Sequence, residues 1–540
     1  MPRLARLGIA MLVIGAGLLV AGTVTGARRD RVFRVGMTGS SVKIDPQVAY
    51  VTTAWWLEYA TAAKLFNYPD KPAPAGARVV REAAARYAVS DHGRTYTFWI
   101  RKGFRFSDGT PVTARSFAYA IDRALSPGLG APAADLVTDP TGTNIVGAQR
   151  VRDGEATHAR GVKARGRRLT IRLVTPDASL PVKLALPFFQ ATSTRLPLTR
   201  EVNVGYPSAG PYYFSRNDVD RLTSIRRNPY WHRGPGRQRP RHLGGLDVRW
   251  GVDEQIAYVQ VTRGELDAGP LPAARVVPVA QRFGVNKSRF WVEPTSCTSY
   301  MPFNSSRPLF HRNPALRRAI SWAIDRKKLL GDDYRRSAWT HMLSPLTSGS
   351  ILAQKKQPYS PRSNIQKARK LAKGHLRNGR IVVIYRSSGA EPDDWVELLR
   401  SELVAIGFDP KKIELKGFTG GGIYDAMATS AGWDFALGPI GWCTDFPDGR
   451  ASLDILTGPV PWALDDPAYA SKLATADKLT GRPRERAFGK LDLEITRKLA
   501  PIVVVGFWNN LFFVGPRVDV RSLVYQPIYA DWSIPALRLK

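Results

Sequence analysis

Strand and helix signals alternate along this chain, and that alternation restricts the folds it can form. The stretch YTFWIRKGFRFSDGTPVTARSFAYAIDRALSP, residues 96–127, shows one such unit in full. Apolar side chains alternate with others from Tyr96 to Ile100, as in a half-buried strand. A Ser-Asp-Gly turn follows, and Thr113 is placed to cap a helix that begins at Ala114. By itself the unit identifies no chemistry.

Similar units recur to the end of the chain. Further strands are predicted within residues 31–38, 210–234, 246–250, 380–387 and 412–418. Further helices are predicted within residues 253–263, 314–324 and 395–406, the second with Asn313 as its cap and Pro314 in its first position. Because a chain of 540 residues can bury several cores, this alternation predicts two or three α/β lobes.

The charge balance is strongly basic. The chain has 79 Lys and Arg against 45 Asp and Glu, which gives a net charge of +34. An excess of this size can attract nucleic acid or an anionic surface. The basic residues are scattered, however, and no long run of like charges appears. We therefore expect no nucleic-acid partner.

The N-terminal residues predict export. Residues 1–6 carry Arg3 and Arg6, and residues 7–27 contain no charged side chain. This order is typical of a secretory signal, and the apolar stretch is also about long enough to cross a bilayer, which takes roughly 20 residues. Cleavage and retention as an N-terminal anchor are both open, and the absence of a nearby cysteine excludes lipid attachment there. We expect an exported ectodomain, in a periplasm-like space or on the outer face of the plasma membrane.

Two cysteines occur, Cys297 and Cys443. In an oxidising compartment they are a candidate disulfide that closes a loop of about 146 residues. The alternative is two buried free thiols. Their spacing excludes a C-x-x-C redox centre, and the seven histidines are dispersed, so no metal site is predicted.

Catalytic motifs are missing from the sequence. It has no G-x-S-x-G elbow, no H-E-x-x-H pair and no Walker-type glycine loop. We therefore expect a protein without catalysis of its own and without a cofactor. An extracellular hydrolase is the remote alternative, because Ser, His and Asp are too common here for a triad to be argued from their presence.

Three of the units, taken in order, resemble one known family. YTFWIRKGFRFSDGTPVTARSFAYAIDRAL matches its strand, Asp-Gly turn and helix. PSAGPYYF…RRNPYWHRG with GELDAG matches a second block, and FNSSRPLFHRNPALRRAISWAIDRKKLL a third. From about residue 33 to residue 540, the chain is similar to the family 5 extracytoplasmic solute-binding proteins, the receptors of peptide ABC importers.

The resemblance implies a fold and a domain organisation. Members of this family are α/β, class II periplasmic-binding-protein-like clamps with two lobes and an additional third domain. In this chain domain I would comprise residues 33–78, 206–296 and 508–540, domain II residues 79–205, and domain III residues 297–507.

The resemblance also implies a binding site. GWCTDFPDG, residues 441–449, is similar to the segment that lines the ligand groove in oligopeptide-binding members. PTSCTSY, residues 294–300, is similar to its partner segment, which implies a disulfide between Cys297 and Cys443. In such members the aspartate, here Asp445, holds the α-ammonium group of the peptide. A buried ammonium needs such a partner, because an unpaired buried charge costs several kcal/mol. The alternative for Asp445 is a turn or helix-capping carboxylate.

Other candidate residues follow from what every peptide presents. Its backbone can be bound as an added strand, whatever its side chains. The candidate flanking segments are residues 441–443 (Gly441, Trp442 and Cys443) and residues 50–53, with Tyr50, Thr52 and Thr53. The candidate aromatic walls, for which core packing is the alternative, are Phe418, Trp433, Trp442 and Trp508.

One part of the family pattern is missing. Oligopeptide binders carry a basic residue for the ligand carboxylate just before Gly-Trp-Cys, where this chain has Leu-Gly-Pro-Ile at residues 437–440. Peptide length and sequence preference are therefore not predicted. We expect a short di- or oligopeptide ligand, an ABC permease as partner, and a monomer. A receptor for haem, or for a nickel or other metal chelate, on the same fold is the alternative.

Overall fold

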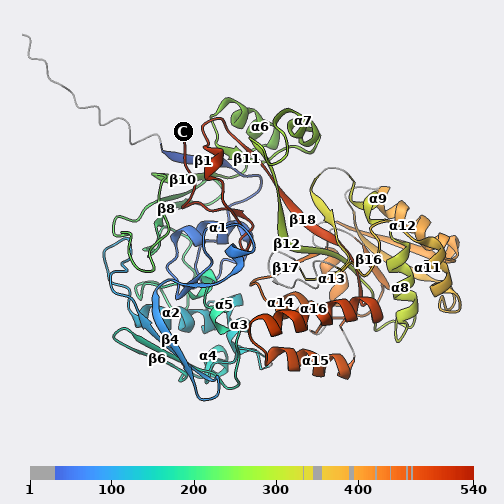
Figure 1. Ribbon diagram of the computed structural model, residues 1–540, viewed down its shortest axis with the longest axis horizontal. Coiled ribbons are helices and arrows are strands. Elements are labelled where there is room, and N and C mark those ends of the chain that lie inside the picture. The colour runs from blue at the N-terminus through green and yellow to red at the C-terminus, as the bar shows by residue number, and fades with distance from the viewer. Residues whose placement is uncertain are drawn as a thin grey trace, which may run out of the picture.

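The computed structural model of the protein has two lobes joined by a pair of long strands (Figure 1). It describes residues 31–140, 142–331, 334–343, 356–387, 394–419, 422–437, 440–457, 460–463 and 466–540. The predicted signal or anchor, residues 1–27, lies outside these residues. Within them, no helix combines the length and the apolar character that crossing a membrane requires.

The largest sheet has nine strands and runs through both lobes. Its order is β17 (Gly441–Cys443), β12 (Phe290–Pro302), β18 (Ile502–Val514), β11 (Ala268–Gly269), β1 (Val32–Gly36), β10 (Gly245–Arg249), β9 (Leu222–Arg227) and β8 (Tyr212–Asp218). The ninth strand, β13 (Arg336–Ala338), pairs with β18. Apart from β1, which is parallel to β10 and β11, neighbouring strands are antiparallel.

The antiparallel pair β12 and β18 joins the lobes, with 13 residues in each strand. At one end Phe290 and Phe513 are buried in a core of the first lobe. At the other end Met301 and Val503 are buried in a core of the second lobe. The two lobes therefore share one continuous piece of sheet, whose register shifts in its middle.

The first lobe also contains a four-stranded antiparallel sheet. Its order is β4 (Ala84–Ser90), β5 (Thr95–Ile100), β7 (Arg168–Arg172) and β6 (Val162–Arg165). Two short pairs accompany it: β2 (Phe66–Asn67) with β3 (Val80–Arg81), and β19 (Tyr525–Gln526) with β20 (Asp531–Trp532). The helices of this lobe are α1 (Thr52–Thr61), α2 (Ala114–Leu125), α3 (Asp135–Thr138), α4 (Ala148–Arg152), α5 (Leu180–Lys183), α6 (Glu254–Arg263) and α7 (Ala273–Phe283).

The second lobe is built on a three-stranded parallel sheet of order β15 (Ile413–Thr419), β14 (Ile381–Ser387) and β16 (Phe435–Leu437). Val383 and Ile384, neighbours on β14, belong to different buried cores, so both faces of this sheet are covered. The helices of the lobe are α8 (Pro314–Ala323), α9 (Arg326–Leu330), α11 (Ile365–Ala372), α12 (Asp394–Ala405), α13 (Gly422–Ala428), α14 (Gly449–Leu453), α15 (Pro467–Asp477) and α16 (Gly481–Lys498).

The units predicted from the sequence are present. β5 covers the alternating stretch, and α2 follows Thr113, whose backbone N donates to Ser116 Oγ at 3.3 Å. Asn313 caps α8 by accepting from the Leu316 N at 3.4 Å, and Pro314 occupies the first position of that helix. The predicted α/β fold class is confirmed.

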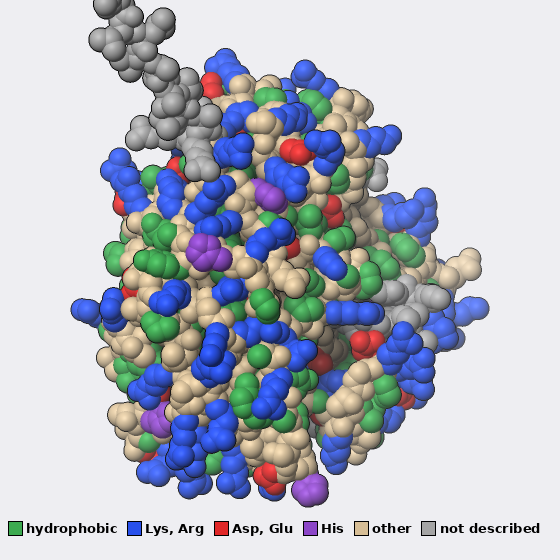
Figure 2. Space-filling view, turned by 60° about the vertical axis from the view of Figure 1, so that its left-hand side comes forward, with side chains coloured by type: hydrophobic (Ala, Val, Ile, Leu, Met, Phe, Trp, Pro, Cys, Tyr) green, Lys and Arg blue, Asp and Glu red, His purple; other side chains and the backbone are tan. Residues whose placement is uncertain are grey.

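Basic side chains dominate the charged surface. Figure 2 shows Lys and Arg spread over the whole visible face, with few Asp or Glu among them. This distribution matches the scattered pattern of the sequence. The lower part of the view, at the height of β4 and β6 in Figure 1, carries several of these cations close together.

A buried ion pair fixes the loop that leads into α1. Arg123, on α2, donates to both carboxylate oxygens of Asp45 at 3.1 and 2.8 Å, and both side chains are 0% exposed. The same carboxylate accepts from the backbone N of Gln47 and of Val202. Buried charges persist in folded proteins when they are paired and hydrogen-bonded in this way. The loop that carries Tyr50 is thereby held against the first lobe.

Replacing Arg123 by alanine leaves the Asp45 carboxylate buried without its cation. We expect Arg123→Ala to lower the free energy of unfolding by about 3–5 kcal/mol. The matched control is Arg115→Ala, which removes an exposed arginine from the same helix and should change stability by less than about 0.5 kcal/mol. Urea unfolding followed by circular dichroism measures both variants, and equal losses would contradict the role given to the ion pair.

Candidate ligand-binding site

The candidate site begins at β17, the terminal strand of the large sheet. β17 pairs with β12 along one side, where Cys297 lies opposite Cys443. The two cysteines form a disulfide with their Cα atoms 3.9 Å apart, so the cross-link implied by the family resemblance is present. It ties β17 to a strand that both lobes share and fixes the register of the pair.

The other side of β17 has no strand beside it within the part of the chain that the structure describes. In an antiparallel pair, residues whose N–H and C=O face the partner alternate with residues whose groups face away. The Tyr300 N donates to the Ile440 O at 3.1 Å, so in this register Trp442 also faces β12. Gly441 and Cys443 therefore direct their backbone N–H and C=O groups to the open edge, where both residues are exposed.

Asp445 lies two residues beyond β17 and contacts the other lobe. The Tyr50 hydroxyl donates to its two carboxylate oxygens at 3.0 and 2.9 Å. Tyr50 comes from the loop before α1, 395 residues away in the sequence. The centroid of its ring lies 5.8 Å from the ring centroid of Trp55 and 5.6 Å from that of Phe188. A predicted residue of the first lobe, Tyr50, thus contacts a predicted residue of the second lobe, Asp445.

The carboxylate of Asp445 forms no ion pair with a described Lys or Arg; its hydrogen-bond partner is a neutral hydroxyl. Burial raises the pKa of Asp445 from 3.8 to about 6, the Tyr50 hydrogen bond opposes that rise, and the nearby Asp454 carboxylate adds to it. Burial and the Asp445 carboxylate also raise the pKa of Tyr50, which keeps its hydroxyl proton for donation. A partly buried carboxylate that lacks a cation is suited to bind a cationic group.

The alternative role for Asp445, a helix-capping carboxylate, does not fit the structure. The cap of α14 is Asp448, whose carboxylate accepts from the Arg450 N at 2.8 Å. Asp448 also accepts from the Arg484 guanidinium at 2.7 and 2.9 Å. The structural role in this acidic segment therefore belongs to Asp448.

Two of the predicted aromatic walls lie at β17: Trp442 belongs to the strand, and Trp508 lies beside it. The Trp442 indole donates to the Ala451 O at 3.0 Å and packs partly against a core of the second lobe. Trp508, on β18, is half-buried, and its indole N–H has no hydrogen-bond partner among the described residues. A Cβ placed on Gly441 would lie 3.4 Å from that indole nitrogen. Trp508 therefore lies beside β17, with a buried indole N–H that no described residue accepts.

Other predicted residues are placed differently from expectation. Trp433 is 1% exposed, and its indole donates to the Thr429 O at 2.8 Å, so core packing, the alternative, is correct for this residue. The candidate flanking segment at residues 50–53 forms no strand, because α1 begins at Thr52 and includes Thr53. The eight residues of α1 that follow, Ala54–Thr61, are buried, so burial of the later turns favours a helix over the β preference of Thr52 and Thr53.

One predicted residue has no described contact with the site, and two residues that do lie near the site were not predicted. Phe418 lies on β15 and is partly buried against a core of the second lobe. Phe188, which packs on Tyr50, was not predicted. Neither was Arg336, whose guanidinium lies 4.9 Å from the ring centroid of Trp508. Both unpredicted residues come from distant parts of the chain and reach the site through the tertiary fold alone.

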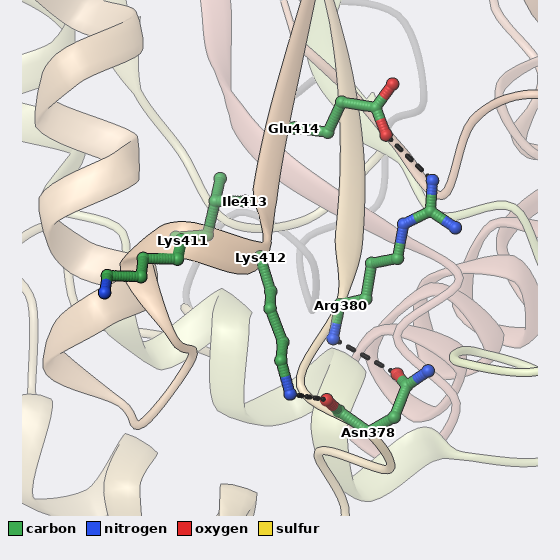
Figure 3. Close-up of a pocket in the computed structure, with 6 residues that line it drawn as sticks. All are labelled: Asn378, Arg380, Lys411, Lys412, Ile413 and Glu414. Carbon is green, nitrogen blue, oxygen red and sulfur yellow. Dashed lines mark hydrogen bonds and ion pairs between the residues drawn. The ribbon is translucent and has the colours of Figure 1, made fainter.

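A separate hollow lies on the second lobe, at the start of β14 and β15 (Figure 3). Its lining residues are Asn378, Arg380, Lys411, Lys412, Ile413 and Glu414. Two of its cations already bind protein acceptors, since Arg380 pairs with Glu414 at 2.9 Å and Lys412 Nζ donates to the Asn378 O at 3.1 Å. None of the predicted site residues lines it. Across the described residues, no group of three or more His, Cys, Asp or Glu is arranged to hold a metal ion.

The two-lobed α/β architecture, with a disulfide-linked sheet edge at the point where the lobes meet, is that of a periplasmic-binding-protein clamp. Residues 78–463 match the family described as bacterial extracellular solute-binding proteins, family 5 Middle. This match covers more than half of the chain, and the chain belongs to this family. The resemblance found in the sequence is confirmed.

Similarity to individual proteins is lower. The chain is 24% identical to the dipeptide-binding protein DppE of Bacillus subtilis (strain 168) over 328 residues, which are 56% of this chain and 53% of that protein. It is 23% identical to the oligopeptide-binding protein OppA of the same organism over 397 residues, 68% of this chain and 67% of that protein. The chain thus spans about half to two thirds of the length of these curated relatives.

A solved structure covers nearly the whole chain. The structure titled clavulanic acid biosynthesis oligopeptide binding protein 2 superposes with a TM-score of 0.78 at 22% identity. The superposition covers 94% of this chain and 96% of that one. At this identity the likeness shows that the two proteins share a fold.

Because burial raises the pKa of Asp445 from 3.8 to about 6, its ionised carboxylate destabilises the folded protein above that pH. The folded-state pKa exceeds the unfolded one, so this loss of stability grows as the pH rises between the two values and is complete above pH 6. We expect Asp445→Asn to raise the free energy of unfolding by about 1–2 kcal/mol at about pH 7.5 and to change it little at about pH 4.

Urea unfolding of the ligand-free protein at these two pH values measures the effect. The control is Glu485→Gln, on the exposed side of α16, which should be neutral at both. A wild-type protein more stable than Asp445→Asn near pH 7.5 would show that Asp445 has a stabilising partner instead.

Proposed function

We propose that the protein is the substrate-binding component of an ABC importer, which captures short peptides outside the membrane and delivers them to the permease. The observation that carries this proposal is the edge of β17 that no described strand pairs with, followed two residues later by the Asp445 carboxylate, which no described Lys or Arg neutralises. A free peptide offers the two complementary features, a backbone that can pair as a strand and an α-ammonium group at its first residue.

The α-ammonium group of the ligand completes the Asp445 site. The carboxylate already accepts from Tyr50 and has acceptor capacity left for further donors. A cation beside it favours the ionised form and returns its pKa toward the ordinary value. Binding near pH 6 therefore releases a proton, and affinity falls as the pH drops below that point. Asp445 is the ammonium contact in this proposal, and Tyr50 orients it.

The open edge of β17 binds the peptide backbone. Gly441 and Cys443 offer N–H and C=O groups that pair with any extended peptide, because strand addition does not depend on side chains. Trp442 and Trp508, both half-buried, add an apolar surface beside this edge. The site thus combines a charge that fixes one end of the ligand with contacts that tolerate varied side chains.

Contacts between the lobes support a clamp that closes over the ligand. Tyr50 of the first lobe binds Asp445 of the second, and Lys183 Nζ lies 5.6 Å from the ring centroid of Phe446. Closure about β12 and β18 would bury the ligand, and the closed form would dock on the permease. The domain division inferred from the resemblance is part of this proposal: domain I at residues 33–78, 206–296 and 508–540, domain II at 79–205, and domain III at 297–507.

The proposal includes export through residues 1–27, as a signal or an anchor, and a monomer without catalysis or cofactor. The two curated relatives described above are named as dipeptide- and oligopeptide-binding proteins. Those names favour a peptide over haem or a nickel chelate as ligand, and a receptor over a hydrolase.

The ammonium contact is tested by removing either partner. An unblocked dipeptide or tripeptide should raise the melting temperature of the protein, whereas the N-acetylated peptide, which lacks the charge, should give a much smaller shift. Asp445→Ala should weaken binding of the unblocked peptide by about 100-fold or more, as measured by titration calorimetry.

Two controls separate this effect from general damage. Glu485→Ala loses the same charge on exposed α16 and should bind as wild type does. Asp445→Ala should bind the acetylated peptide no worse than wild type. If Asp445→Ala keeps wild-type affinity for the unblocked peptide, the ammonium assignment is wrong.

The strand contact is tested on the ligand, with the protein unchanged. Because N–H groups along an added strand alternately face β17 and face away, methylating successive backbone nitrogens of one peptide should have alternating effects. A methyl on a nitrogen that faces β17 removes a donor and should weaken binding by about 5- to 10-fold or more. A methyl on the next nitrogen is the matched control and should be tolerated. Uniform effects along the peptide would contradict binding as a strand.

A further inference from the structure

The four-stranded sheet of the first lobe has one face turned to solvent. Its inner face includes the buried Tyr96, Phe98 and Ile171 and packs against α2, although Tyr87 and Val89 on the edge strand β4 are exposed. The side chains that alternate with these point outward and are exposed or half-buried. These outward residues, the basic sheet face, are Arg86, Ala88, Ser90, Thr95, Thr97, Trp99, Lys163, Arg165, Arg168, Thr170 and Arg172.

Strand pairing orders these residues into rows across the sheet. One row is Arg86, Trp99, Arg168 and Arg165. The next row is Ala88, Thr97, Thr170 and Lys163. Four strands at a spacing of about 4.8 Å make this face about 14 Å wide between its outer strands. The basic sheet face is thus a broad surface with cations on both edge strands and on the central strand β7, and with hydroxyl groups between them.

Most cations of this face have no acidic partner among the described residues, although Arg172 lies near enough to Asp91 to help lower the pKa of that carboxyl. None of the four strands contains Asp or Glu. Within the described residues, Arg86, Lys163, Arg165 and Arg168 form no ion pair, although the Arg86 guanidinium lies 3.6 Å from the ring centroid of Trp99. The acid nearest in sequence is Asp91, in the turn after β4, and it pairs with Arg94 at 2.5 Å. The face therefore presents an uncompensated positive field.

The basic sheet face lies far from the candidate ligand site. In Figure 1, β4 and β6 are at the lower edge of the molecule, whereas β17 is at its centre. The same lower region, turned toward the viewer, shows Lys and Arg gathered together in Figure 2. Binding at this face would leave β17 and Asp445 free, so it calls for a partner other than the transported ligand.

We propose that the basic sheet face binds the surface of an anionic lipid bilayer. A bilayer is a broad polyanion that needs no shaped partner, and each Lys or Arg held near it contributes to binding through its charge. Trp99, set among arginines, suits the headgroup region, where Trp is enriched at membrane surfaces. The contact is independent of the proposed peptide capture, and it would hold an extracellular receptor at the membrane with its ligand site open.

Other polyanionic or protein partners fit this surface less well. Single-stranded nucleic acid is bound by cations together with aromatic rings open for base stacking, whereas the Trp99 ring carries the Arg86 guanidinium. Protein interfaces have an apolar, often aromatic, centre, whereas the central strands here present Thr97 with Thr170 in one row and Trp99 beside Arg168 in the next. A face of scattered cations whose single tryptophan is covered by an arginine favours the lipid surface.

The test measures co-sedimentation of the full chain with vesicles. Vesicles of phosphatidylcholine with about one third phosphatidylglycerol are compared with vesicles of phosphatidylcholine alone, which report any binding by the apolar residues 7–27. We expect stronger binding to the anionic vesicles, and a loss of that difference when salt is raised from about 0.05 M to about 0.5 M. The combined variant Lys163→Gln, Arg165→Gln and Arg168→Gln should lower the anionic partition coefficient on the order of 100-fold.

The matched control removes three exposed lysines from the second lobe, through Lys370→Gln, Lys373→Gln and Lys411→Gln. This variant has the same net charge and should keep nearly all of the wild-type binding. Unchanged peptide-induced thermal shifts show that both variants are folded. Equal losses in the two variants, or equal binding of wild type to neutral and anionic vesicles, overturn the proposal. So does a preference for a single-stranded oligonucleotide that the sheet variant alone abolishes.

Discussion

The structure depends on the hydrogen-bonded pairing of β12 with β18. One end of the pair is buried in the first lobe and the other in the second, so neither lobe completes its cores without the same two strands. β17 depends on β12 in turn, through three residue pairs and the Cys297–Cys443 disulfide. β17, whose edge is assigned to ligand binding, is therefore attached directly to the strand pair that joins the lobes. A movement of one lobe about these strands reaches that edge without an intervening loop.

Two acids of one short segment illustrate how stability and binding are separated. Asp448 caps α14 and pairs with Arg484, both side chains being largely buried, so its charge is matched within the protein. Asp445, three residues earlier, has a tyrosine hydroxyl as its partner and an elevated pKa. An acid that the protein neutralises holds the fold, and an acid that it leaves without a cation is available to a ligand. The difference lies in the partners that the tertiary structure supplies, since both residues follow β17 closely.

The sequence alone predicted the features that depend on residues close together in the chain. Asn313 and Pro314 mark the start of α8 because a cap and a fixed φ act within one turn. The approach of Tyr50 to Asp445 spans 395 residues, and the family resemblance alone suggested that both belong to one site. Trp433, a candidate ligand wall, is a core residue instead, because an aromatic side chain alone does not reveal the surroundings it will meet. Burial of Trp433 and of residues 54–61 in α1 is decided by elements distant in the chain.

The length of β17, three residues, has a consequence beyond the ligand. An unpaired sheet edge is a template on which strands of neighbouring molecules can assemble, and proteins commonly restrict such edges by keeping them short. Gly441 and Cys443 offer enough hydrogen-bonding groups for a small extended guest but too few to nucleate a sheet between two copies of the protein. Tyr50 of the opposite lobe also stands beside this edge, at Asp445. Even at high concentration, therefore, copies of the protein can expose this unpaired edge without assembling into an intermolecular β-sheet.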